Sequence, residues 1–214
     1  MPVKIDESGY NTLRMFLLSC PATIGEKALD KYYQYKGNFP VSIEDILGEF
    51  FWVITEIPNN AFARLISYAK KRSLKIIDSD TVCLFFGGKE HLEATQNTCV
   101  IFDDLSNDEK MAGHMAMPIK VKKISGKKIS GKIAGHGMAV ENIYNPFSEI
   151  SVGDTILVHF ATVINPTPTQ ELIKKLYNMQ KSFRENELAK VDKIKYNLAF
   201  ENTKKKIEKA LRLG

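Results

Sequence analysis

Histidine is the residue type in this chain that is best suited to bind a metal ion. His159 lies near the end of the hydrophobic segment 155–163, and imidazole is a suitable ligand for Fe(II). A structural histidine, hydrogen bonded to the backbone, is the alternative for this residue. His91 lies close to Glu90 and Glu93, but closeness in sequence alone does not place three side chains around one ion. His136 lies between two glycines, which predicts a turn.

The other reactive residue types form no pattern typical of an enzyme. No serine lies in a Gly-x-Ser-x-Gly motif, and the acidic residues are scattered, without a pair placed for acid–base catalysis. No two cysteines have the C-x-x-C spacing of a zinc site. Cys20, Cys83 and Cys99 are expected to be small buried hydrophobic residues. We therefore expect a protein that is not an enzyme.

Composition and charge are those of an ordinary globular chain. The 214 residues are 44% hydrophobic and 26% charged, with a net charge of +5, which excludes the collagen-like and wholly disordered classes. No segment approaches the roughly 18–20 consecutive apolar residues of a membrane span. Residues 1–9 lack the pattern of a secretory signal. We expect a cytoplasmic protein with reduced cysteines and no membrane partner.

The overall fold class is predicted to be α+β, with residues 1–104 forming a small α+β domain. Hydrophobic periodicity and β-branched runs predict three helices and then two strands. The predicted helices cover residues 25–35, 42–54 and 60–69, and the predicted strands cover residues 81–86 and 98–102. The polar segment 105–112 is expected to be a linker.

The segment from residue 113 to residue 169 has the pattern of an all-β domain. The sequence KKISG at Lys122–Gly126 is repeated directly at Lys127–Gly131, and its Ser-Gly pairs predict the turns or bulges of a hairpin. Ser151–Asp154 predicts a turn before a single long strand over residues 155–163. Thr169 is a predicted N-cap for the helix that follows.

Two motifs in this segment resemble those of a known family. Met115–Val121 (MAMPIKV) matches the latter part of an opening motif, with Pro118 as its anchor, and Val152–Ile164 (VGDTILVHFATVI) follows a second motif closely. On these motifs, residues 113–180 resemble the HypC/HupF family of NiFe-hydrogenase maturation chaperones. The resemblance implies an OB-like β-barrel over residues 113–169, followed by a helix.

The resemblance also implies a function in metallocentre assembly. In the family, a Cys after the initiator Met engages a HypD partner and iron; counted back from Pro118, that position is His114. The resemblance therefore implies that His114 and His159 face one site and hold iron transiently. The partner would be a HypD-like protein or a metalloenzyme precursor. Residues implied to bind it are Met115, Met117, Pro118, Gly153 and Asp154.

Two alternatives stay open for the barrel. Because the family Cys is absent, the domain could be an interaction module without metal chemistry. OB-like barrels also bind single-stranded nucleic acid through basic grooves and exposed rings, although aromatic residues are sparse here. The lysines that would supply the charge are Lys122, Lys123, Lys127, Lys128 and Lys132.

The positive charge of the chain is concentrated in its last segment. Residues 170–214 contain twelve Lys and Arg against six Asp and Glu. Their apolar positions recur at helical spacing, which predicts a basic amphipathic helical tail with one buried face. These positions are Leu188, Val191, Ile194, Leu198, Ile207 and Leu211. We expect the tail to pack on the barrel or on the N-terminal domain, so its charge is not by itself evidence for a nucleic-acid partner.

Overall fold

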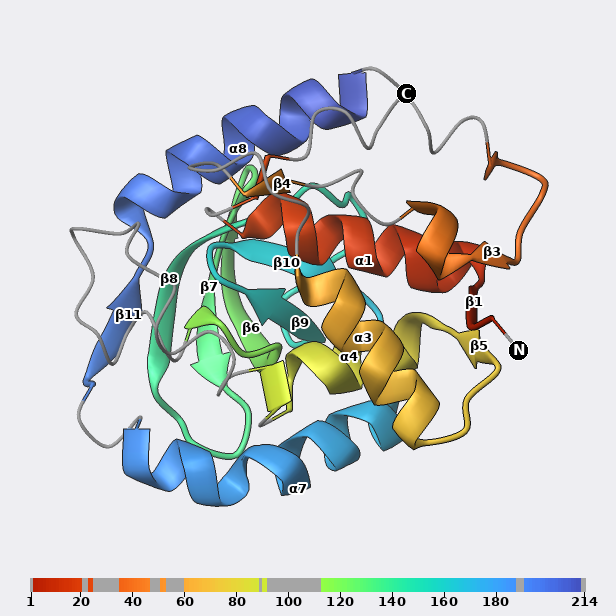
Figure 1. Ribbon diagram of the computed structural model, residues 1–214. Helices are drawn as coiled ribbons and strands as arrows, with labels where there is room; N and C mark the ends of the chain where they lie inside the picture. The colour runs from red at the N-terminus through yellow and green to blue at the C-terminus, as the bar shows by residue number, and fades with distance from the viewer. Residues whose placement is uncertain are drawn as a thin grey trace.

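The structure, a computed structural model, has an α+β fold in which helices surround a strongly curved sheet (Figure 1). It describes residues 2–20, 23–24, 35–46, 51–52, 60–88, 90–91, 113–187 and 191–212. The predicted strand at 98–102, the predicted linker at 105–112 and Cys99 lie outside the described residues, as does the predicted helix at 25–35 except for its last residue.

The helices in the described part of the chain are α1 (Glu7–Ser19), the short 3-10 helix η1 (Ile43–Ile46), α3 (Asn60–Lys71), α4 (Ser79–Phe86), α7 (Gln170–Glu187) and α8 (Asn197–Arg212). The strands are β1 (Lys4–Ile5), β2 (Thr23–Ile24), β3 (Val41–Ser42), β4 (Phe51–Trp52), β5 (Ile76–Ile77), β6 (Met117–Ser125), β7 (Lys128–Ile133), β8 (Ala139–Tyr144), β9 (Thr155–His159), β10 (Thr162–Asn165) and β11 (Lys193–Lys195).

Strands β6 to β10 close into a β-barrel. Their order is β10-β9-β6-β7-β8, and the parallel pairing of Thr162 with Tyr144 joins β10 to β8 and completes the ring. Apolar residues at alternate positions, such as Ile119 and Val121 on β6, are fully buried in the barrel core. The predicted α+β class with a small β-barrel is confirmed.

The repeated KKISG sequence forms the β6–β7 hairpin. Ile124 of the first copy pairs with Ile129 of the second. Gly126 in the connecting turn has a φ of +56°, which glycine adopts without steric cost. A bulge follows Val121, so the two consecutive side chains Lys122 and Lys123 are both exposed.

Residues 155–163 form a hairpin and not the single strand that their hydrophobicity predicts. β9 ends at His159, and β10 runs back beside it, with Thr162 paired to His159. The reversal occurs at Phe160, whose φ is +47°, a conformation that is rare for a bulky residue. The Phe160 N–H donates a hydrogen bond to the Gly113 carbonyl at 2.8 Å. This segment has no Gly, Pro or Asn to indicate a turn, so tertiary contacts decide it.

Residues 81–86 are helical, so the predicted strand is wrong. The carboxylate of Asp78 accepts a hydrogen bond from the Thr81 N–H at 2.7 Å and caps the N-terminus of α4. Val82, Cys83, Phe85 and Phe86 are buried. The cap and the burial of these side chains outweigh the β propensity of the individual residues.

The predicted helix over residues 42–54 is also wrong, whereas the one over residues 60–69 is confirmed by α3. Ser42 pairs with Lys4 in a small sheet of order β3-β1-β5, and the described residues that follow it form the short 3-10 helix η1. Phe51–Trp52 pairs as β4 with β2. Pairing with a distant strand overrides the helical periodicity of this segment.

The basic tail packs on the barrel and on α1. It is not one continuous helical element, because Lys193–Lys195 adds β11 in parallel to β8. α8 then crosses the top of the molecule in Figure 1, in contact with β8 and α1. The Lys206 ammonium donates a hydrogen bond to the Cys20 carbonyl at 2.9 Å, which caps the C-terminal end of α1.

One apolar core joins the helical part to the barrel. The rings of Phe16 on α1 and Phe86 on α4 stack at 4.2 Å between centroids, and Leu157 of β9 and Leu176 of α7 belong to the same cluster. α1 therefore lies against β10 of the barrel wall, and α4 packs on α1. None of the described helices is long and apolar enough to cross a membrane.

Candidate metal centre

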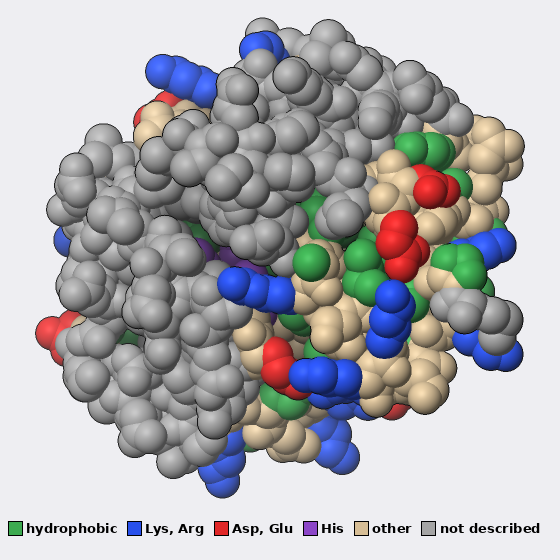
Figure 2. All heavy atoms as spheres, in the orientation of Figure 1, with side chains coloured by type: hydrophobic (Ala, Val, Ile, Leu, Met, Phe, Trp, Pro, Cys, Tyr) green, Lys and Arg blue, Asp and Glu red, His purple; other side chains and the backbone are tan. Residues whose placement is uncertain are grey.

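Three histidines from distant parts of the sequence lie close together at the end of barrel strand β9. His91 follows α4, His114 precedes β6, and His159 is the last residue of β9. Each offers one ring nitrogen to a group in which all three nitrogens lie within 4.8 Å of one another. Their exposed fractions are only 6%, 3% and 1%. Figure 2 shows small parts of histidine side chains, in purple, recessed behind a Lys or Arg side chain.

Gln180 forms hydrogen bonds to both of the segments that carry His91 and His114. Its buried side-chain amide donates to the carbonyl of Gly87 at 3.0 Å and to that of Ala116 at 2.8 Å. The Ala116 N–H also donates to the Phe86 carbonyl. The end of α4 and the start of β6 are therefore held in one place by a side chain from α7.

His114 is placed by the turn between β9 and β10. The Phe160 ring lies against the His114 ring, with 4.5 Å between centroids. Gly113 has no space for a side chain, since a Cβ there would lie 2.7 Å from Cδ1 of Phe160. The close approach of Gly113 to the turn thus brings His114 beside His159, and their ring centroids are 6.3 Å apart.

Ser19, the last residue of α1, determines the tautomer of the neutral His159 ring. The Ser19 hydroxyl donates its one hydrogen to the Phe16 carbonyl at 2.8 Å. At 2.6 Å from Nδ1 of His159, the same oxygen must therefore accept a hydrogen bond from Nδ1–H. The lone pair of the ring is then on Nε2. That atom is buried and has no hydrogen-bond partner among the described residues.

The surroundings of the three imidazoles are apolar and aromatic. Phe86 lies 4.5 Å from His91, and Phe16 lies 5.1 Å from His159, measured between ring centroids. Neither ring nitrogen of His114 has a hydrogen-bond partner in the described part of the chain. Buried polar atoms without partners are uncommon and require an explanation. An ion bound between the rings would supply the missing partner.

Burial keeps these imidazoles uncharged. Desolvation lowers the pKa of His114 to about 3. It also holds the pKa values of His91 and His159 well below the usual range, and the neighbouring imidazoles lower them further. Neutral imidazole is the form that ligates a metal ion. The cluster is therefore ready to bind a cation without first releasing protons at neutral pH.

Three imidazoles, the ligand group found among the described residues, match the donor set of an open transition-metal site. Nitrogen ligands lie about 2.0–2.1 Å from zinc, so nitrogens around a tetrahedral ion are about 3.4 Å apart. The widest separation here, 4.8 Å or less, requires a contraction on the order of 1 Å around the ion. Such sites leave a fourth position for a non-protein ligand.

The sequence reasoning identified two of the three histidines. It placed His114 and His159 at one site through the family resemblance, and the structure brings their rings together. It set His91 aside, because the neighbouring Glu90 and Glu93 gave no ligand geometry. Glu90 in fact turns away to an ion pair with Arg72 at 3.0 Å, and Glu93 lies outside the described residues. No spacing in the sequence indicates His91, since the fold alone brings it to His114.

The other predicted site residues lie elsewhere. Met115, Met117 and Pro118 are buried, whereas Gly153 and Asp154 are exposed in the turn before β9. His136 is exposed in the turn between β7 and β8. The five lysines of the nucleic-acid alternative are exposed on the β6–β7 hairpin, where Lys127 pairs with Glu208 of α8 at 3.2 Å.

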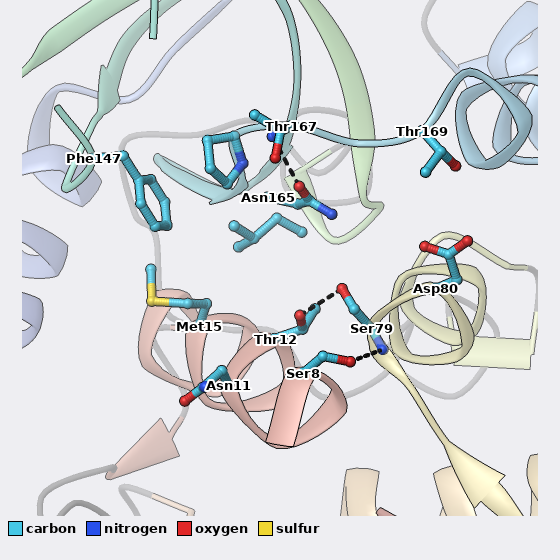
Figure 3. A pocket seen from close by; sticks show the side chains of 12 residues that line it. Ser8, Asn11, Thr12, Met15, Ser79, Asp80, Phe147, Asn165, Thr167 and Thr169 are labelled. Carbon is cyan, nitrogen blue, oxygen red and sulfur yellow. Dashed lines mark hydrogen bonds between the residues drawn. The ribbon is translucent and has the colours of Figure 1, made fainter. Parts of the chain in front are cut away.

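A separate polar pocket lies between the N-terminal ends of α1, α4 and α7 (Figure 3). Its volume is about 430 Å³. Several of its polar groups bond to one another: Thr12 with Ser79 at 2.7 Å, and the Ser79 N–H with the Ser8 hydroxyl at 3.2 Å. Because none of the three histidines lines it, this pocket is distinct from the histidine cluster.

Comparison with known proteins adds no relative to this description. No protein-family model, no curated protein and no solved structure matches the chain. The proposed function therefore depends on the geometry of the histidine cluster and on the motifs described above.

Proposed function

We propose that this protein binds one transition-metal ion through His91, His114 and His159. The observation that carries this proposal is the meeting of three buried, uncharged imidazoles with ligand atoms within 4.8 Å of one another. Both ring nitrogens of His114 and Nε2 of His159 are buried without a hydrogen-bond partner among the described residues. Such burial is unfavourable, and a bound cation provides the missing partners.

The ion proposed here is Fe(II), held for assembly of a metallocentre in another protein. Imidazole is a ligand for Fe, Zn, Cu and Ni alike, so the donor set supports a transition metal and does not choose between them. The choice of iron and of an accessory function depends on the HypC/HupF-like motifs around Pro118 and His159. In this proposal the barrel is OB-like. His114 stands at the position of the family's Cys, and His91 supplies a further imidazole ligand in place of a thiolate.

The exposed turn at Gly153 and Asp154 is the proposed contact for the partner protein. Asp154 Oδ2 accepts a hydrogen bond from the Ser151 N–H at 2.7 Å, which fixes the turn, and Val152 beside it is 63% exposed. This exposed side chain stands next to the two residues that the family resemblance implies for the partner contact. The partner would be a HypD-like protein or a metalloenzyme precursor.

The nucleic-acid alternative has less support from the described barrel. Of the three aromatic residues between positions 113 and 169, Tyr144 and Phe160 are fully buried and cannot stack on bases. Phe147 is only partly exposed. Proteins that bind single strands combine a basic groove with exposed rings, and the lysines of the hairpin supply only the first of these.

Anaerobic loading with Fe(II) tests the proposal. The protein is incubated with excess Fe(II), separated from free metal by gel filtration, and assayed for iron and protein. We expect one iron per chain for the wild type and for His136→Ala, the matched control that removes the exposed histidine. His91→Ala, His114→Ala and His159→Ala should each retain far less. Equal iron in all five proteins would overturn the proposal.

Co-purification tests the accessory function separately. A HypD-type protein is captured anaerobically with the iron-loaded chain, with Val152→Ser as the variant of the exposed turn. Capture by the wild type that is lost in this variant supports the partner contact. An absence of capture by the wild type would contradict the accessory function and leave metal binding standing.

A further inference from the structure

The polar pocket between α1, α4 and α7 has the size and depth of a small-molecule site. Its volume of about 430 Å³ lies within the range of roughly 300–1,000 Å³ that is usual for ligand pockets. All of its lining residues belong to the described part of the chain. Thr12 and Ile164 are buried at its base, whereas Ser8, Thr167 and Thr169 are exposed at its rim. The pocket is therefore open to solvent and has a buried base.

The two sides of the pocket differ in chemistry. Figure 3 shows Phe147 and Met15 on one side, and Asp80 with Thr169 on the opposite side. The phenyl ring and the thioether offer an apolar surface, while the carboxylate and the hydroxyl offer hydrogen-bond acceptors. A ligand that fills the pocket needs an apolar body on the first side and a polar group on the second.

Asp80 determines the sign of that polar group. It is the one charged residue in the lining. Burial and the charge of Asp78 raise the pKa of Asp80, although Lys175 opposes this effect. Lys175 is itself paired with Glu171 at 2.7 Å, so the two aspartates leave this side of the pocket with an excess of negative charge. A positively charged group beside Asp80 is therefore favoured.

The helix N-termini at the pocket do not reverse this preference. Free N–H groups at a helix N-terminus attract anions, but the chain supplies acceptors of its own here. The Asp78 carboxylate accepts a hydrogen bond from the Thr81 N–H at 2.7 Å at the start of α4, and the Thr169 hydroxyl accepts one from the Leu172 N–H at 3.1 Å at the start of α7. These contacts occupy N–H groups that an anion would need, so the pocket is better suited to a cation.

We propose that this pocket binds a small primary amine with an apolar body. An ammonium group donates hydrogen bonds and accepts none, which matches the Asp80 carboxylate and the Thr169 hydroxyl beside it in Figure 3. The apolar body lies beside Phe147 and Met15. Because none of the three histidines lines the pocket, the inference goes beyond the proposed function and does not depend on the metal centre.

Phenethylamine, a primary amine with an aromatic body, tests the inference. The methionine methyl groups of the full chain are labelled with carbon-13, Met15→Leu identifies the Met15 signal, and the amine is titrated by NMR. We expect a saturable shift of the Met15 signal, because Met15 lines the pocket. The signal of Met179, which is 40% exposed on α7 outside the lining, should not move.

Two probes of similar shape and different charge test the recognition of the ammonium group. Phenylpropionate, at the same ionic strength, should bind at least about fivefold more weakly than phenethylamine, because its carboxylate meets Asp80. Phenethyl alcohol is neutral and should also bind more weakly than the amine. Its affinity should be the same for the wild type and for Asp80→Asn.

Asp80→Asn removes the charge and keeps the shape of the side chain. We expect phenethylamine to bind at least about fivefold more weakly to this variant. Glu201→Gln is the matched control, since it removes one negative charge at an exposed position of α8. Its affinity for phenethylamine should equal that of the wild type.

The outcomes separate this inference from the metal centre. Equal affinity of phenethylamine for the wild type and Asp80→Asn would overturn the inference, as would phenylpropionate that binds as tightly as the amine. A Met15 signal that saturating amine leaves in place would show that no such ligand enters the pocket. None of these results bears on the histidine cluster, which the Fe(II) loading experiment tests.

Discussion

The Ser19 hydroxyl accepts a hydrogen bond from Nδ1–H of His159 at 2.6 Å, because its own hydrogen is donated to the Phe16 carbonyl. The last turn of α1 thereby sets the tautomer of a residue at the end of a barrel strand, far away in sequence. Such outer contacts orient metal-ligating histidines and tune their basicity. The packing of α1 on the barrel therefore leaves Nε2 of His159 as the nitrogen that can bind a metal ion.

Ser19→Ala should weaken metal binding much more than it weakens the fold. Loss of the orienting contact is expected to lower metal affinity by about 10- to 100-fold, whereas a single lost hydrogen bond costs about 1 kcal/mol of the free energy of unfolding. Competition with a chromophoric chelator measures the first quantity, and urea unfolding of the metal-free protein measures the second.

Ser79→Ala is the control for this experiment, since it removes a comparable hydroxyl contact with Thr12 at 2.7 Å away from the cluster. Its metal affinity should match that of the wild type. If both serine variants lose affinity equally, Ser19 has no special part in orienting His159.

Gln180→Leu should destabilise the protein and disturb the metal centre together. The variant leaves the carbonyls of Gly87 and Ala116 buried without their donor, at a cost of about 1–3 kcal/mol for each group. Because these carbonyls flank the segments that carry His91 and His114, metal affinity should also fall. Gln170→Leu, at an exposed position of the same helix, should leave both quantities unchanged. A Gln180→Leu protein as stable as the wild type would contradict the role of this side chain.

Gly113→Ala should force the Phe160 ring away from His114. The added Cβ would lie 2.7 Å from Cδ1 of that ring, and overpacking of this kind costs about 1–3 kcal/mol. We expect lower stability in urea and weaker metal binding. Gly137→Ala, where a Cβ meets nothing within 4 Å but φ is +85°, should lower stability alone. Unchanged metal affinity in Gly113→Ala would separate this turn from the site.

Metal-free protein should lose stability as the pH falls below about 6.5. Burial lowers the pKa of His114 from 6.5 to about 3, and the pKa values of His91 and His159 are lowered as well. Below pH 6.5 the unfolded chain therefore binds more protons than the folded one. The stabilisation is complete above this pH and is lost progressively towards the folded-state pKa values.

Urea unfolding at pH 7 and pH 5 measures this effect. The expected loss over this interval is about 2 kcal/mol from His114, and the lowered pKa values of His91 and His159 add to it in the same direction. His114→Leu should reduce the loss, and His136→Ala, at an exposed position, should leave it as in the wild type. A loss in His114→Leu as large as in the wild type would show that His114 is not buried in its neutral form.

Local patterns in the sequence were sufficient where a segment folds by its own periodicity or turns. The KKISG repeat predicted the β6–β7 hairpin, and the helical spacing after Asn60 predicted α3. The same patterns failed where distant contacts decide the structure. Residues 81–86 form α4 because Asp78 caps a helix whose apolar side chains are buried, although the same residues have high β propensity.

The candidate site shows the same division. The family-like motif around His159 and the position before Pro118 indicated two histidines, because these lie on the barrel that the motifs describe. His91 joins them only through the placement of α4 against β6, which Gln180 holds. No sequence pattern predicts the role of Ser19 either, since its contact with His159 depends on how α1 packs on β9 and β10.

X-ray absorption on the iron-loaded protein is the most direct test of the central claim. The account predicts an ion coordinated by three imidazole nitrogens, and only two in His91→Ala if that variant retains iron. Coordination by sulfur, or a His91→Ala spectrum identical to that of the wild type, would contradict a metal centre built from His91, His114 and His159.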